Sequence, residues 1–268
     1  MKINNKTNVF ISVASFPGNT GALLHNLGYK ISKLNCVYIP FKCDDLAQLK
    51  NILNVKKFRG ISVSMPFKSS IIKYLDKIDK TSKTINAVNT ILRKGNKLYG
   101  YNTDYLAIKK IIERIKFNIF TSIILGNGAT SKTTYEVLKN LKVKKIILCA
   151  RDISKFKNWK LRKSDIIISW DKRHKIKVDL LINCTPIGMK FNNNLPIAIF
   201  KNKQPKHIID FPVNKKTKLK LLSKRLKIPY TGGLEISLIQ GIEQFKIYTG
   251  KKLNINKIKK ILNYNFDV

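Results

Sequence analysis

Residues 122–141 read SIILGNGATSKTTYEVLKNL and give the strongest indication of the fold. The apolar run 122–125 predicts a buried strand, two glycines follow at once, and 131–141 has the spacing of a helix. Gly126 permits a tight turn, and Gly128 lets the backbone approach a pyrophosphate at the helix N-terminus. Ser131 holds the place of the third glycine in GxGxxG, and similar turns occur without a ligand, so the segment predicts a βαβ unit and a candidate dinucleotide site.

The same alternation of strands and helices extends outward in both directions. Strands are predicted over 9–13, 37–40, 60–65 and 88–92 in the first half, and over 122–125, 146–149, 166–169, 180–183 and 208–210 in the second. Helices are predicted over 46–53, 71–78, 131–141, 236–248 and 255–262, with a hairpin turn over 93–97. Repeated β-α units predict an α/β protein with mainly parallel sheets.

Composition narrows the class of protein. The chain has 268 residues and 44% hydrophobic content, enough for a substantial core, and it lacks an apolar run of membrane-spanning length. The N-terminal sequence MKINNKTNVF has no signal-peptide pattern, and the four cysteines and three histidines show no zinc or disulfide spacing. We therefore expect a cytoplasmic protein with no metal site and no membrane partner.

The formal charge of +38 raises the question of nucleic-acid binding. The 53 Lys and Arg residues are spread along the chain instead of forming a basic arm, which is typical of a solvated lysine surface. We expect no nucleic-acid partner, although a preference for anionic ligands stays open.

Basic residues follow the second strand of the βαβ unit. NAD sites usually place a carboxylate there for the ribose hydroxyls, whereas NADP sites place Arg for the 2′-phosphate. Arg151 stands at this position, with Lys155 one turn onward. The pattern favours NADP; Asp152 leaves dual specificity open, and both bases could also be ordinary surface residues.

Two residues of the first half suit ketone reduction. Lys68 follows SVSMPF (62–67) after a predicted strand, and Asp104 ends GYNTD (100–104) at the start of a helix. Reduction needs hydride delivery to carbon and a proton for the developing alkoxide, which an ammonium near a carboxylate supplies. The alternatives are that Lys68 is one surface lysine among many and that Asp104 is a helix N-cap.

Five ordered blocks resemble the shikimate dehydrogenase family: SVSMPFK (62–68), INAVNT (85–90), GYNTD (100–104), NCTPIGM (183–189) and QGIEQFKIYTG (240–250). By this resemblance Lys68 and Asp104 match the catalytic pair, while Ser64, Asn89 and Gln240 match substrate-binding residues. The residues that the resemblance assigns to the NADP(H) site are Gly126, Asn127, Gly128, Ala129, Arg151, Lys155, Thr185, Met189 and Gly233.

The resemblance also implies an architecture and a reaction. It implies a two-domain α/β protein with a discontinuous substrate domain, 1–103 with 236–268, and a Rossmann-type NADP-binding domain, 104–235. The implied reaction is reversible NADPH-dependent reduction of 3-dehydroshikimate to shikimate, in chorismate and aromatic amino-acid biosynthesis. The expected partner is this small-molecule substrate, and the expected assembly is a monomer or homodimer.

The chain departs from the family pattern at two places. Alignment on His25 and Asn26 puts Asn19 and Gly21 where typical members carry two serines that bind the substrate carboxylate. DFPVNKKT (210–217) lacks the usual tyrosine. The pattern at Asn19 and Gly21, together with EQF (243–245), resembles a divergent, shikimate dehydrogenase-like branch. It leaves open a dehydrogenase for quinate or another cyclic hydroxy acid, and a non-catalytic basic protein that binds anions or nucleic acid.

Overall fold

The computed structural model describes residues 3–262. Within them the chain divides into two compact units, the first made of the residues up to Leu106 and from Leu238 onward, and the second of Ala107–Ser237. The divisions fall inside two helices, α4 (Thr103–Glu113) and α7 (Gly233–Thr249), which therefore contribute to both units. In the described part of the chain, no helix is long and apolar enough to cross a membrane.

The sheet of the first unit has the strand order β2-β1-β3-β5-β6-β4. Its strands are β1 (Asn8–Ala14), β2 (Cys36–Lys42), β3 (Phe58–Val63), β4 (Lys77–Ile78), β5 (Thr90–Lys94) and β6 (Lys97–Tyr101). β1 pairs in parallel with β2 and β3, whereas β5 is antiparallel to β3 and β6. The turn between β5 and β6 contains Gly95 at φ +59°, as a tight hairpin requires.

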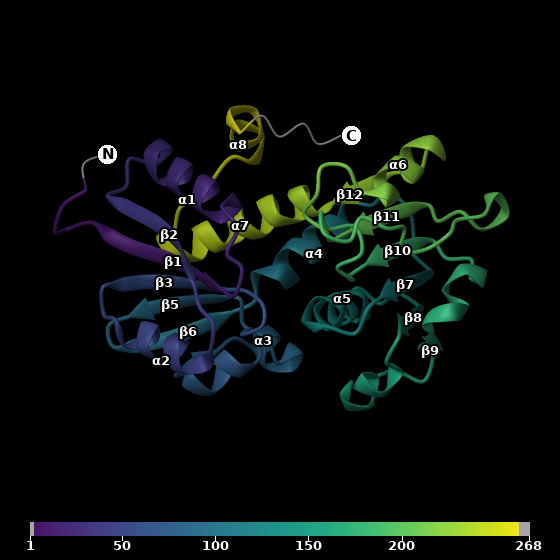
Figure 1. Cartoon of the computed structure of the whole chain (residues 1–268), viewed down its shortest axis with the longest axis horizontal. Helices are drawn as coiled ribbons and strands as arrows, with labels where there is room; N and C mark the ends of the chain where they lie inside the picture. The colour runs from purple at the N-terminus through teal and green to yellow at the C-terminus, as the bar shows by residue number, and fades with distance from the viewer. Residues whose placement is uncertain (1–2, 263–268) are drawn as a thin grey trace. The chain divides into compact units, whose positions relative to one another are not determined.

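Side chains that alternate along β1 build a core on each face of this sheet. Phe10 packs in one cluster with Tyr29 and Phe245, which come from α1 and α7, whereas Ile11 packs in the other with Leu49 of α2. The helices of this unit outside α4 and α7 are α1 (Thr20–Ile31), α2 (Leu46–Asn54), η1 (Ser70–Tyr74), α3 (Lys80–Ile85) and α8 (Ile255–Ile261). The sheet is thus covered by helices on both faces (Figure 1).

The sheet of the second unit is entirely parallel, in the order β12-β11-β10-β7-β8-β9. Its strands are β7 (Thr121–Leu125), β8 (Lys145–Ala150), β9 (Ile166–Ser169), β10 (Leu180–Asn183), β11 (His207–Asp210) and β12 (Tyr230–Gly232). Its helices are α5 (Ala129–Asn140), α6 (Lys218–Arg225), η2 (Ile153–Asn158), η3 (Trp170–Lys175) and η4 (Lys201–Lys203). The order reverses at β7, and in such sheets ligands bind beyond the carboxyl ends of the strands at the reversal.

The predicted helix over 71–78 is wrong. Its apolar spacing is helical, but the chain forms the 3-10 turn η1 and then pairs β4 with β6. Asp76 donates its N–H to the carbonyl of Leu98 and accepts the Leu98 N–H through Oδ2, at 3.0 and 2.7 Å. These pairings with a distant strand outweigh the local helical preference.

Candidate active site

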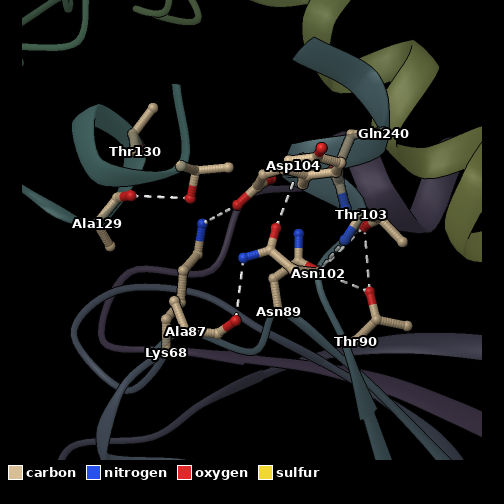
Figure 2. A network of polar contacts seen from close by, with 12 residues as sticks. Lys68, Ala87, Asn89, Thr90, Asn102, Thr103, Asp104, Ala129, Thr130 and Gln240 are labelled. Carbon is tan, nitrogen blue, oxygen red and sulfur yellow. Dashed lines mark hydrogen bonds and ion pairs between the residues drawn. The ribbon is translucent and has the colours of Figure 1, made fainter. Parts of the chain in front are cut away.

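Lys68 and Asp104 form an ion pair in the first unit. Lys68 lies in the loop between β3 and η1, and its Nζ is 2.6 Å from Oδ2 of Asp104 in the first turn of α4. The two side chains are 16% and 20% exposed, so the pair is partly shielded from solvent. Figure 2 shows the contact between them.

Asp104 is not the cap of its helix. Asn102 supplies the cap, because its Oδ1 accepts the N–H of Tyr105 at 3.0 Å. The Nδ2 of Asn102 donates to the carbonyl of Ala87 at 3.0 Å and anchors the start of α4. The interpretation of Asp104 as a helix N-cap is therefore wrong, and its carboxylate is available to Lys68.

Two of the predicted substrate-binding residues meet at Thr103, which the sequence reasoning did not select. Asn89 Oδ1 accepts the N–H of Thr103 at 2.8 Å and its hydroxyl at 3.1 Å. Gln240 Nε2 donates to the same hydroxyl at 3.0 Å. Thr103 is fully buried next to Asp104, so it places Asn89 and Gln240 beside the Lys68–Asp104 pair (Figure 2). The only feature of the sequence that could have identified Thr103 is its place inside GYNTD.

The remaining predicted substrate residues lie where β1 and β3 end. Ser64 is exposed, and its N–H bonds to the carbonyl of Val13 at 3.0 Å. Asn19 is exposed at the start of α1 and makes no capping hydrogen bond through its side chain. A Cβ added to Gly21 would lie 3.4 Å from the hydroxyl of Tyr38, so this position has room for a small side chain. Because β1 and β3 are parallel neighbours, their following loops leave the sheet at one edge.

The glycine turn of the second unit has the shape that a pyrophosphate requires. Gly126 has φ +110° and donates its N–H to the carbonyl of Cys149 at 2.8 Å. Apart from its chain neighbours, no atom of the described residues lies within 4 Å of where a Cβ on Gly128 would stand. Gly128 is also the N-cap of α5 and offers no capping side chain, so Ala129 begins a helix whose first amides can face an anion. These residues fit a dinucleotide.

Of the exposed charged residues that follow β8, one caps a helix. Arg151 and Lys155 are exposed, and Arg151 makes no ion pair within residues 3–262. Asp152 instead caps η2, since its Oδ1 accepts the N–H and hydroxyl of Ser154 at 3.0 and 2.6 Å. These bonds lower the pKa of Asp152. Asn127 Nδ2 donates to the Asp152 carbonyl at 2.7 Å and ties the glycine turn to this loop.

Thr185, Met189 and Gly233 lie in segments that follow or end the strands β10 and β12. Thr185 donates its N–H and hydroxyl to Oδ1 of Asn183, at 3.1 and 2.6 Å. Met189 bonds to the carbonyl of Pro186 at 3.0 Å and so closes a turn. Gly233 stands where a Cβ would meet the backbone of residues 211–212, with the Pro212 carbonyl oxygen at 2.5 Å. Only glycine allows this approach.

One cavity of about 380 Å³ lies elsewhere on the second unit. Its walls include His207 and Thr231, from the side of β11 and β12 where these strands begin, and it contains none of the predicted site residues. Burial lowers the pKa of His207 to about 4, so this imidazole is neutral and bonds to the Thr231 hydroxyl at 2.9 Å. The cavity is at the wrong edge of the sheet for the glycine turn.

A Rossmann strand order with an open glycine turn, and a separate α/β unit with a lysine–carboxylate pair, define a two-domain dinucleotide-dependent dehydrogenase.

The sequence matches one family of known proteins. A family model described as "Shikimate dehydrogenase substrate binding domain" matches residues 20–91. The "Shikimate dehydrogenase (NADP(+))" of Staphylococcus epidermidis is 31% identical over 247 residues, which cover 90% of this chain and 91% of the relative. The chain belongs to the shikimate dehydrogenase family.

Solved structures agree over nearly the whole chain. A structure described as a "shikimate 5-dehydrogenase-like protein" matches with a TM-score of 0.85 and 27% identity, covering 98% of this chain and all of the other. A shikimate dehydrogenase solved in complex with NADP+ matches with the same score and identity, covering 99% and 98%. The predicted fold class, two α/β domains of which one is a Rossmann domain, is confirmed.

Proposed function

We propose that this protein catalyses the reversible NADPH-dependent reduction of 3-dehydroshikimate to shikimate, a step of chorismate and aromatic amino-acid biosynthesis. The relatives named shikimate dehydrogenase (NADP(+)) support this assignment. The observation that carries it is the Lys68–Asp104 pair, 2.6 Å apart and partly shielded, beside the buried Asn89–Thr103–Gln240 contacts.

Lys68 and Asp104 divide the proton chemistry between them. The Lys68 ammonium hydrogen-bonds the carbonyl oxygen of the substrate and gives it a proton as the alkoxide develops. Asp104 orients that ammonium through its Oδ2. The hydride comes from NADPH when the cofactor is bound.

Asn89 and Gln240 position the substrate ring. Three donors, the N–H and hydroxyl of Thr103 and the hydroxyl of Thr90, already occupy Oδ1 of Asn89. Within the described residues its Nδ2 has no partner, so Nδ2 is the atom offered to a substrate oxygen. Gln240 offers its Oε1 from the same cluster, since its Nε2 bonds to Thr103. Ser64, Asn19 and Gly21 complete the proposed substrate site.

The proposed NADP(H) site lies in the second unit. The glycine turn, from Gly126 to Ala129, would face the pyrophosphate, and Arg151 with Lys155 would bind the 2′-phosphate. The engagement of Asp152 Oδ1 in capping η2 supports NADP over NAD, because one of the two carboxylate oxygens is already occupied. Thr185, Met189 and Gly233 would lie on the nicotinamide side.

We assign the substrate domain to the first unit and the cofactor domain to the second, close to the predicted boundaries of 1–103 with 236–268 and 104–235. The predicted cytoplasmic location, the absence of a nucleic-acid partner and the monomeric or homodimeric state stay predictions from the sequence.

The test is NADP+ reduction by the purified protein with shikimate, run beside quinate and NAD+. We expect turnover with shikimate and NADP+ that falls roughly 10²- to 10⁴-fold in Lys68→Ala. Lys73→Ala removes an exposed lysine five residues away and serves as the matched control.

Other outcomes overturn parts of the proposal. Unchanged turnover in Lys68→Ala removes this lysine from the chemistry. Faster turnover of quinate would assign the substrate to the alternative that Asn19 and Gly21 suggest. A folded protein that binds NADPH but oxidises neither acid would refute the proposed reaction.

A further inference from the structure

A buried carboxylate lies at the carboxyl end of β11 in the second unit. Asp210 is fully inaccessible, and no Lys, Arg or His of residues 3–262 forms an ion pair with it. It accepts three hydrogen bonds, from Asn183 Nδ2 at 2.7 Å and from the hydroxyls of Thr217 and Tyr230 at 2.8 Å each. Burial raises the pKa of Asp210, although the three donors favour its ionised form.

A side chain of this kind is costly in a core. Burying a carboxylate requires every lone pair to find a donor, and an apolar residue of similar size would usually be no less stable. The three donors come from three separate segments: the end of β10, the N-cap of α6 and the start of β12. Asp210 therefore holds together the segments that leave this edge of the sheet.

The carboxylate decides which way the amide of Asn183 faces. Asp210 is an acceptor, so Nδ2 of Asn183 must point to it, and Oδ1 must point to Thr185. Nδ2 also donates to the carbonyl of Ile187 at 2.8 Å, while Oδ1 accepts the N–H and hydroxyl of Thr185. Rotating the amide by half a turn would put oxygen against carboxylate and break all four contacts. The charge of Asp210 thus holds residues 183–187 in one shape.

The second branch from Asp210 reaches the same loop. Thr217 donates to Asp210 Oδ2 and accepts the N–H of Lys220 at 3.0 Å, so it fixes the start of α6 and the end of loop 211–217. Within that loop, Asn214 Nδ2 donates to the carbonyl of Gly188 at 2.9 Å. Both branches therefore support the segment 183–189.

We propose that Asp210 is a positioning residue for the cofactor: through Asn183, Thr217 and Tyr230 it holds loop 183–189 in the shape that receives the nicotinamide half of NADP(H). The inference rests on the proposed function for the identity of the dinucleotide. It predicts that loss of the carboxylate weakens contacts to the nicotinamide half and spares contacts to the adenosine 2′-phosphate half.

The experiment compares two ligands in Asp210→Asn. An Asn at 210 has no charge and carries an NH2 group in place of one carboxylate oxygen. That NH2 group either opposes Nδ2 of Asn183 or requires the hydroxyls of Thr217 and Tyr230 to accept in place of donating. We expect the Kd for NADPH to rise on the order of 10- to 100-fold. The Kd for 2′,5′-ADP, which lacks the nicotinamide half, should stay within about twofold of wild type if the loop is the only part disturbed.

Asp179→Asn is the matched control, because Asp179 immediately precedes β10 at the opposite edge of the same sheet and accepts the N–H groups of Phe120 and Thr121. It should lower the unfolding midpoint and leave the ratio of the two Kd values unchanged. Tyr230→Phe removes one donor without adding a polar group, so it repeats the test if Asp210→Asn does not fold. We expect a smaller rise, several-fold, in the Kd for NADPH alone.

Wild-type affinity for NADPH in both variants, or equal losses for both ligands, would overturn the inference. A wild-type protein that binds NADPH but does not oxidise shikimate would refute the proposed reaction and leave the role of Asp210 standing. A wild-type protein that binds NADPH no better than 2′,5′-ADP would show that the loop adds nothing, and would also overturn the inference.

Discussion

Replacing Arg151 by alanine tests cofactor selection at the end of β8. Its guanidinium is exposed and makes no ion pair within the described residues, so the substitution removes no ion pair that stabilises the fold. Asp152 beside it bonds to Ser154 through Oδ1, and in the proposed site Arg151 and Lys155 are the groups that distinguish a 2′-phosphate from a hydroxyl. The proposed site therefore predicts a change of selectivity without a change of stability.

The magnitude follows from the hydrogen bonds that are lost. A hydrogen bond to a charged group contributes about 1.5–3 kcal/mol, which corresponds to roughly 10- to 150-fold in kcat/KM for NADP+. NAD+ lacks the phosphate, so its kcat/KM should change less than about twofold. Because the site is exposed, the loss should shrink as ionic strength rises and the phosphate is screened.

The assay is steady-state oxidation of shikimate with each cofactor at low and high salt. Lys157→Ala is the control, since it removes an exposed charge from η2, the short segment that follows Arg151. Equal losses with NAD+ and NADP+ in Arg151→Ala, or the same loss in Lys157→Ala, would show that these residues are ordinary surface bases.

Three further predictions concern stability. Burial lowers the pKa of His25 to about 4, so the unfolded chain binds a proton below about pH 6.5 that the folded chain excludes. The free energy of unfolding should thus fall on the order of 3 kcal/mol between pH 6.5 and 4. Urea titrations at several pH values should show that this free energy depends less steeply on pH in His25→Gln than in wild type. The same pH dependence in both proteins would contradict the prediction. Gly233→Ala should lower the thermal midpoint because its Cβ would meet backbone carbonyls, whereas Gly18→Ala, which has open space, should not. Asn102→Ala should lower the free energy of unfolding, measured in urea, by about 1–3 kcal/mol, because the α4 cap and the hydrogen bond to Ala87 are lost. An unchanged free energy of unfolding would show that the Asn102 cap does not stabilise the protein.

Much of the site could be predicted from local sequence because its parts are local. A run of apolar residues, Gly126 and Gly128 specify a strand, a turn and an open helix start through backbone preferences alone. The blocks around Lys68 and Asp104 indicated the catalytic pair through resemblance, and the structure places the two side chains in contact. Those roles stay proposals until the variants are measured.

The helix predicted over 71–78 and two elements not predicted, α6 and β12, show what local patterns miss. Apolar spacing over 71–78 is helical, but strand pairing with β6 decides the conformation. α6 has only eight residues, KLKLLSKR, and β12 has three, so each segment is too short for a periodic pattern to identify it.

The class of fold, the order of its units and the residue types at the site follow from the amino-acid sequence, because each of these is encoded in short segments. The folded chain is needed to show that Thr103 joins Asn89 to Gln240, that Asp152 is engaged as a cap, and that Asp210 anchors three segments. Hydrogen bonds between residues far apart in the chain depend on distances and directions that only the folded backbone sets.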